Sequence, residues 1–367
     1  GMPQEKEGDA ALFYDYPALE GAWAHSVTEE PDGAEKVSGE KREEVAEFLE
    51  RLREDSALYG RFLDLPPRLR KEFLDFCTGQ KGVKITYDPF FRFVFNPELH
   101  PERLERLLSS ILKEKVRIRR VLPPDPMRFH ESMPLVIMDI LVELAGGALC
   151  SVEIQKAPYA FPGQRAACCS SELVVRQYSR ERQKAKAEGV PFSYHNLSRV
   201  YTVVLLEKSS GDFCRYSDHY VHRAAQVFDT GLSLNLLQEY VFISLDIFRT
   251  IVHETKEEPE AWLMFLSSDD PADIARVTAA FPEFAEYYRE IADLRENPKE
   301  LIGMFGRTLA EMDRDEYFGM MEQLREDVKN LSEQTQRLRK EKESLEWEKL
   351  SVEKANRSLA DEKQSLE

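Results

Sequence analysis

The segment from residue 101 to residue 207 alternates between the two hydrophobic periods that distinguish helices from strands. Some stretches repeat apolar residues every three to four positions, whereas others are short apolar runs rich in β-branched residues. The predicted elements are a helix at 101–113, strands at 116–122, 135–144 and 148–155, a helix at 163–187 and a strand at 200–206. The last strand can join the third in parallel only through the intervening helix, in a right-handed crossover. This order predicts an α/β core built on a mixed sheet.

Weaker patterns on either side predict additions to this core. The first 40 residues are acidic and rich in Gly, Pro, Ser and Ala, which is typical of a poorly ordered leader. The next segment has apolar residues at helical spacing, divided by Pro66 and Pro67, and so predicts two helices. Beyond the core the pattern predicts helices and one strand around 240–245. The predicted division is a leader at 1–40, a helical cap at 41–80, the core at 81–210, a mainly helical subdomain at 211–315 and a coiled coil at 316–367.

Seven apolar residues recur at every seventh position near the C-terminus, in a stretch without proline. They are Leu324, Leu331, Leu338, Leu345, Val352, Leu359 and Leu366. The complementary core positions become polar toward the end; they are Met321, Val328, Thr335, Lys342, Lys349, Asn356 and Lys363. Buried Asn or Lys at such positions favours two parallel strands. We therefore expect a parallel coiled-coil homodimer through residues 321–367; the alternative is a solvated single helix with ion pairs between residues i and i+4.

The distribution of charge favours a nucleic-acid partner for one segment only. The net charge of −17 would oppose contact with nucleic acid if it were spread evenly. Residues 81–210, however, contain 20 Lys and Arg against 14 Asp and Glu, so the core is basic and the rest strongly acidic. The five cysteines form no C-x-x-C pair, which is typical of reduced thiols in a cytoplasmic protein. No apolar run approaches the roughly 20 residues that span a bilayer, so no transmembrane helix is expected.

Two acidic residues interrupt predicted strands that are otherwise apolar. Asp139 lies in the run from Leu135 to Val142, and Glu153 lies in the run from Cys150 to Gln155. A buried carboxylate needs a counter-charge, a cation or an opening to water. One metal ion would satisfy both carboxylates, and hard oxygen ligands suit Mg²⁺ or Mn²⁺. The pattern therefore predicts a metal site at Asp139 and Glu153.

The length of the loop between these strands decides whether the two carboxylates share a face of the sheet. A two-residue loop made by the paired glycines would point Asp139 away from Glu153. A three-residue loop, Ala145–Gly147, places Asp139 across from Glu153, with Gln155 two residues further along the same face. We therefore predict the three-residue loop or an equivalent bulge.

At these residues the sequence resembles the PD-(D/E)XK nuclease superfamily, and within it the bacterial PD-(D/E)XK nuclease family transposases, which are related to recombination-promoting nucleases. The resemblance covers residues 80–315 and rests on the run from Tyr87 to Phe95, on Asp139, on the run from Val152 to Lys156, and on Gln164-Arg165. It implies a restriction-endonuclease-like αβββαβ core with a mixed sheet and helical additions. It also implies a metal-dependent endonuclease that hydrolyses DNA phosphodiester bonds, with a link to mobile elements or recombination.

The resemblance also implies roles for single residues. Asp139 and Glu153 would hold Mg²⁺ or Mn²⁺, with the main-chain carbonyl of Ile154 completing the site, and an activated water would attack phosphorus. Gln155 stands where the superfamily name expects lysine; its amide can orient water or a phosphate oxygen but supplies no charge. Lys156 follows directly, and in a regular strand it would project to the other face.

Further candidates lie before and after the predicted hairpin. Asp88 would lie near the site, as an acidic residue does in this family; the alternative is that it caps the turn at residues 90–95. One face of the predicted helix at 163–187 carries four basic residues that would bind DNA phosphates, namely Arg165, Arg176, Arg180 and Lys184. The alternative, for Arg180 and Lys184 above all, is a solvated helix face.

Several enzyme classes are disfavoured by the sequence. It contains no G-x-S-x-G elbow, Walker loop, dinucleotide fingerprint or paired C-x-x-C motif, which argues against serine hydrolases, nucleotide-driven enzymes and zinc fingers. Our first hypothesis is a dimeric, cytoplasmic, magnesium-dependent deoxyribonuclease with DNA as partner and no contact with membranes. The second is an inactive DNA-binding or scaffold protein in which Gln155 marks lost chemistry and the coiled coil supplies the function. The third is a nuclease for RNA or for particular nucleic-acid structures.

Overall fold

The computed structural model describes residues 39–122, 140–156, 158 and 161–366. The chain divides into two units, Gly1–Arg51 and Leu52–Glu367. In the first unit the described residues belong to helix α1 (Gly39–Glu54). Most of the leader predicted at 1–40, and the candidate site residue Asp139, lie outside the described residues.

A mixed sheet of six strands organises the described part of the second unit. The strands are β1 (Ile118–Val121), β2 (Ile140–Leu144), β3 (Leu149–Gln155), β4 (Val200–Leu206), β5 (Val221–Ala225) and β6 (Gln238–Ser244). Their spatial order is β1-β2-β3-β4-β6-β5. The pairs β1–β2, β2–β3 and β5–β6 are antiparallel, and the pairs β3–β4 and β4–β6 are parallel. The predicted mixed sheet is therefore confirmed.

The hairpin between β2 and β3 has the predicted three-residue loop. Ile140 lies opposite Val152, and the register continues without interruption to Glu143 opposite Leu149. The amide of Gly147 donates to the carbonyl of Leu144 at 2.8 Å, which closes the turn. Gly147 has a φ of 87°, a left-handed conformation that glycine adopts without steric cost. This is the register for which the sequence argument places Asp139 across from Glu153, although Asp139 itself is not among the described residues.

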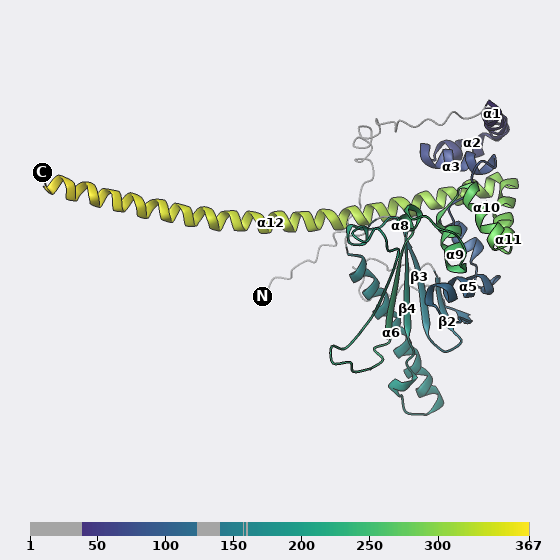
Figure 1. The fold of residues 1–367 in the computed structure, drawn as a ribbon, viewed down its shortest axis with the longest axis horizontal. Helices are drawn as coiled ribbons and strands as arrows, with labels where there is room; N and C mark the ends of the chain where they lie inside the picture. Colours follow the sequence, from purple (N-terminus) through teal and green to yellow (C-terminus); the bar gives the residue numbers. More distant parts are fainter. Residues whose placement is uncertain (1–38, 123–139, 157, 159–160, 367) are drawn as a thin grey trace, which may run out of the picture. The chain divides into compact units, whose positions relative to one another are not determined.

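Helix α6 (Pro162–Glu188) connects β3 to β4 and covers one face of the sheet, as the crossover argument predicted. The apolar cluster beneath it contains Leu141, Leu149, Leu173 and Val200. Helix α5 (Pro101–Leu112) lies on the other face of the sheet. Tyr201 of β4 points to that face, and its hydroxyl donates at 3.0 Å to Glu114, two residues after the end of α5. Figure 1 shows α6 and α5 on opposite sides of the strands. The predicted order of helix, three strands, helix, strand is thus observed from α5 to β4.

Other helices extend the unit before and after this core. They are α2 (Ser56–Leu63), α3 (Pro67–Cys77), α4 (Asp88–Val94), α7 (Gly211–Cys214), α8 (Leu245–Thr250), α9 (Glu258–Ser267), α10 (Pro271–Ala280), α11 (Phe284–Asp293) and α12 (Pro298–Leu366). Phe305 fixes the first turns of α12 to α3 and α4, because its ring centroid lies 5.6 Å from that of Phe73 and 5.7 Å from that of Phe90. Such aromatic pairs add specificity to the burial of their rings.

Residues 211–315, which we predicted as a mainly helical subdomain, supply strands to the sheet as well as helices. Strand β6 lies beside β4 and includes most of the strand predicted around 240–245. Strand β5 was not predicted, because its residues are half-buried or exposed and include His222 and Arg223, so they show no apolar alternation. The predicted domain boundaries stay predictions.

Helix α12 runs without interruption through the predicted coiled coil. Its heptad side chains are largely uncovered within one chain: Leu331 is 61% exposed, and Leu338 and Leu345 are each 58% exposed. The pairing of two such helices stays a prediction. No helix in the described part of the chain is both long and apolar enough to cross a membrane.

Candidate active site

Glu153 and Gln155 lie on the face of the sheet that α6 covers. β3 is a central strand, and its side chains alternate, so Glu153 and Gln155 share the face of Leu149, which packs beneath α6. Both side chains are buried, at 4% and 1% exposure. The side chain of Ile154, whose carbonyl was a predicted ligand, belongs to the opposite face.

The carboxylate of Glu153 is held by polar groups from α6 and from its own strand. Arg165 donates from Nε to Oε1 at 2.8 Å, and Gln155 donates from Nε2 to the same oxygen at 3.4 Å. The Sγ of Cys169 lies 3.7 Å from Oε2. Burial, and next the negative charge of Glu153, raise the pKa of the Cys169 thiol, so it remains a protonated donor. Arg165 therefore balances the one charge that the buried strand carries here.

Gln155 carries an unsatisfied acceptor beside this carboxylate. Its Oε1 atom is buried and accepts no hydrogen bond in the described part of the chain. Such an atom costs about 1–3 kcal/mol unless a ligand or ion satisfies it. A hard cation prefers carboxylate and amide oxygens, so the observed donor set fits Mg²⁺ or Mn²⁺. The described residues contain no group of three or more side chains of the types His, Cys, Asp or Glu that could together hold a metal ion.

The two accessory candidates lie at element ends: Asp88 begins α4, and Lys156 directly follows β3. Asp88 is the first residue of α4 and accepts a 2.8 Å hydrogen bond from Arg92 one turn later. Tyr87, rather than Asp88, occupies the N-cap position of that helix, so the alternative in which Asp88 caps the turn is not observed, and its place near the site stays a prediction. Lys156 directly follows β3 and is buried.

Three of the four predicted phosphate-binding cations make ion pairs within the protein. Arg165 contacts Glu153 as described, and Arg176 contacts Glu172 at 2.9 Å. Arg180 contacts Glu143 of β2 at 3.0 Å. The fourth, Lys184, is exposed. Arg180 is thus half-buried and ion-paired rather than simply solvated, and DNA binding by this set stays a prediction.

Glu143 is a second buried carboxylate on the face that α6 covers, and the sequence did not single it out. It is buried at 3% exposure, on the α6 face, and contacts arginines from β1 and α6. The signal was present, because Glu143 lies in the same predicted apolar strand, 135–144, as Asp139. It could have been found by treating every carboxylate of that strand alike.

The match to a family model covers most of this fold. The model of the PD-(D/E)XK nuclease family transposase matches residues 86–319, which is more than half of the chain. The chain belongs to this family. The mixed sheet with its flanking helices is accordingly a restriction-endonuclease-like α/β fold, as predicted. A search of curated proteins and a search of solved structures each found no match.

A second polar cluster of the PD-(D/E)XK core lies where β3 and β4 end. The amide of Glu207 donates to the carbonyl of Gln155 at 2.9 Å, and its side chain is 3.8 Å from the ammonium of Lys84. Lys84 also lies 4.0 Å from Glu72, and the two line a cleft of about 370 Å³. This places a charged cleft next to the end of the strand that carries Glu153.

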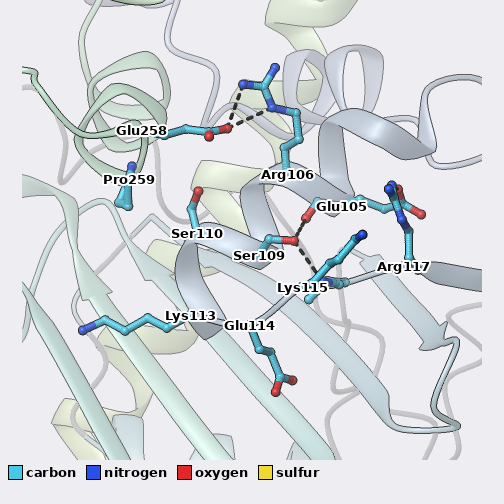
Figure 2. A pocket seen from close by; sticks show the side chains of 11 residues that line it. Glu105, Arg106, Ser109, Ser110, Lys113, Glu114, Lys115, Arg117, Glu258 and Pro259 are labelled. Carbon is cyan, nitrogen blue, oxygen red and sulfur yellow. Dashed lines mark hydrogen bonds and ion pairs between the residues drawn. The ribbon is translucent and has the colours of Figure 1, made fainter.

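A further pocket lies beside α5, on the other face of the PD-(D/E)XK sheet. It has a volume of about 510 Å³ and is formed by α5, the segment after it and the start of α9 (Figure 2). Both of its arginines are ion-paired: Arg106 contacts Glu258 at 2.8 Å, and Arg117 contacts Glu105 at 2.7 Å. Because α5 and Glu153 belong to opposite faces, this pocket is separate from the candidate active site.

Substituting Arg165 by Gln is expected to lower the free energy of unfolding by about 3 kcal/mol, because the buried Glu153 carboxylate loses its counter-charge. The double variant Glu153→Gln/Arg165→Gln is expected to recover most of this loss, since neither charge remains. Urea unfolding in EDTA measures both. The matched control is Arg199→Gln, whose partner Glu239 is 36% exposed, and its cost should stay below about 1 kcal/mol. If Arg165→Gln and Arg199→Gln lowered the free energy of unfolding by the same amount, the ion pair of Arg165 with Glu153 would not be a buried one.

Proposed function

We propose that this chain is a metal-dependent endonuclease that hydrolyses DNA phosphodiester bonds. The observation that carries the proposal is the pair of Glu153 and Gln155, buried on one face of β3, in which the Gln155 amide contacts the carboxylate through its nitrogen and keeps an unsatisfied oxygen. The family supports a nuclease or transposase-related function. The basic segment that contains this pair supports a polyanionic substrate.

Mg²⁺ or Mn²⁺ is the proposed cofactor. Glu153, the Oε1 atom of Gln155 and the carbonyl of Ile154 would hold it together with Asp139, which lies outside the described residues. A divalent cation bound there would lower the pKa of a water and stabilise negative charge on the phosphate. The three-residue loop after β2 supports this set, because it is the register for which we predicted that Asp139 faces Glu153.

The chain's own residues have separate tasks in this proposal. With a cation balancing Glu153, the guanidinium of Arg165 would turn one of its donors to a phosphate oxygen, where it would stabilise the charge that grows during attack. Gln155 would orient water through its amide but cannot supply positive charge. Lys156 and Asp88 remain accessory candidates, and Arg176, Arg180 and Lys184 would contact DNA phosphates further along α6.

The proposed assembly is a homodimer through residues 321–367, in which two active sites could cut opposite strands. The exposed heptad side chains of α12 support it, because they would be buried against a second helix. The described cysteines are free thiols, and we propose the reducing cytoplasm as the compartment.

A non-catalytic DNA-binding or scaffold protein is the second candidate. It is favoured by two features, which are the ion pair of Arg165 with Glu153 at 2.8 Å and the glutamine at position 155, where the superfamily name expects lysine. The two candidates differ in one measurable property, since only the enzyme needs a divalent cation to alter DNA.

The deciding experiment incubates supercoiled plasmid with the full-length protein in Mg²⁺, in Mn²⁺ or in EDTA, beside the Asp139→Ala variant. We expect nicked or linear DNA only with metal and only from the wild type. Single-stranded DNA and RNA of matched length serve as competing substrates, and faster cleavage of RNA would favour the RNA-nuclease alternative. If the wild type and the variant leave plasmid intact under every condition, the scaffold hypothesis replaces the enzyme.

A further inference from the structure

Three guanidinium groups converge on one buried carboxylate at the far end of β3 from Gln155. Glu143 of β2 lies opposite Leu149, the first residue of β3. Its Oε2 atom is 2.7 Å from Arg120 and 3.0 Å from Arg180, and its Oε1 atom is 3.3 Å from Arg119. β1 contributes two of these arginines and α6 contributes the third.

A β-bulge in β1 makes this convergence possible. In a regular strand, neighbouring residues point to opposite faces of the sheet, so Arg119 and Arg120 could not share a partner. The pairing of β1 with β2 shifts between Ile118 and Arg120, which leaves Arg119 as the additional residue of the bulge. A bulge redirects a side chain locally, and here it brings two consecutive guanidiniums to one carboxylate.

The cluster carries more positive charge and more hydrogen-bond donors than its carboxylates use. Each guanidinium has five N–H donors, and one carboxylate cannot accept them all. Among the described residues, Glu181 is a second acidic partner, 3.6 Å from Arg180. The side chains of Arg119 and Arg120 are 66% and 51% exposed, whereas that of Glu143 is 4% exposed. The buried carboxylate of Glu143 thus holds the guanidiniums of Arg119 and Arg120, while both arginine side chains remain more than half exposed to solvent.

We propose that Arg119, Arg120 and Arg180 form a phosphate-binding clamp for duplex DNA, organised by Glu143. The proposal rests on the nuclease function proposed above and extends it to a second contact with the substrate. Glu143 and Glu153 belong to the same face and lie about 13 Å apart along the strands, since four residues of β3 separate their positions. That distance corresponds to about four base-pair steps of a duplex.

The chemistry of the cluster favours a nucleic-acid backbone over a single small anion. Arginine binds phosphate oxygens through two parallel N–H bonds, and a row of arginines matches repeating phosphates better than a single small anion. Backbone contacts carry no sequence information, so the clamp fixes the register of the duplex on the protein and leaves sequence choice to other residues.

The test is binding of a fluorescein-labelled 30-base-pair duplex by full-length protein in EDTA, followed by fluorescence anisotropy over a series of NaCl concentrations. For Arg119→Gln/Arg120→Gln we expect affinity to fall by at least about tenfold, and the slope of log K against log[NaCl] to become shallower by about 1.8, or 0.9 for each lost phosphate contact. Arg180 still pairs with Glu143 in this variant, so no buried carboxylate is stranded. The single variant Arg119→Gln, which loses the longest of the three contacts, should give half the change in slope.

Arg199→Gln is the matched control. Its side chain is 53% exposed and ion-paired with Glu239, but it belongs to the α5 face, so affinity and slope should stay at wild-type values. An unchanged slope in the double variant, or no DNA binding by the wild type, would overturn the clamp. A change seen with duplex RNA and not with DNA would overturn the assignment to DNA. Because EDTA prevents metal-dependent cleavage, failure of the nuclease proposal in the plasmid experiment is distinguishable from failure of the clamp.

Discussion

Replacing Glu153 by glutamine is expected to slow plasmid cleavage by about a thousandfold or more, which corresponds to about 4 kcal/mol of lost transition-state stabilisation. The substitution keeps the size of the side chain and its place on β3 but removes the charge that Arg165 and the proposed cation share. Neutral glutamine offers a weaker ligand to a hard divalent ion. Initial rates of conversion of supercoiled to nicked plasmid, measured over a range of Mg²⁺ concentrations, give the size of the effect.

The matched control for this prediction is Glu290→Gln. Glu290 also holds a buried arginine, with its two carboxylate oxygens 2.7 and 2.6 Å from the guanidinium of Arg103, and those hydrogen bonds lower the pKa of Glu290. It lies on α11, away from the candidate site, so its loss should affect stability but leave the cleavage rate within about threefold. If Glu153→Gln cleaved plasmid within about threefold of the wild-type rate, as expected for Glu290→Gln, Glu153 would not belong to the active site. Loss of cleavage in both variants to the same degree would point to unfolding.

The order of elements could be predicted because its signals are local. The helical spacing of α5, the paired glycines after β2 and the β-branched run of β4 each determine an element without reference to the rest of the chain. Strand β5 lacks such a signal, and its strand conformation depends on pairing with β6, which a single sequence does not show. Because β5 carries no local signal of a strand, residues 211–315 were predicted as mainly helical.

The partners of the site residues were harder to predict than the residues themselves. Alternation along β3 was enough to put Glu153 and Gln155 on one face. The contact of Arg165 with Glu153, however, depends on how the crossover helix docks on the sheet, and that docking is a tertiary property. The predicted basic stripe of α6 is in part a row of counter-ions for buried carboxylates. The bulge at Arg119 left no mark in the hydrophobic pattern.

Introducing glutamate at two heptad positions, Leu331→Glu and Leu338→Glu, is expected to dissociate the proposed homodimer. Both side chains are more than half exposed in one chain and would be buried in the seam of a coiled coil. A dimer would lose four buried leucines at about 1.5–3 kcal/mol each, so Kd should rise by more than about ten-thousandfold. Sedimentation equilibrium of the full-length protein should give the mass of two chains for the wild type and of one chain for the variant.

The control Gln336→Glu/Ser344→Glu adds the same negative charge to α12 at positions outside the predicted seam, so the mass should remain that of two chains. Orientation is tested with Thr335→Cys, at a core position of the heptad. In a parallel pair the two introduced thiols are neighbours across the seam and should form a disulfide under mild oxidation, whereas an antiparallel pair centred elsewhere would separate them. A wild-type mass of one chain would contradict the coiled coil and would also remove the reason to expect paired cuts on opposite DNA strands.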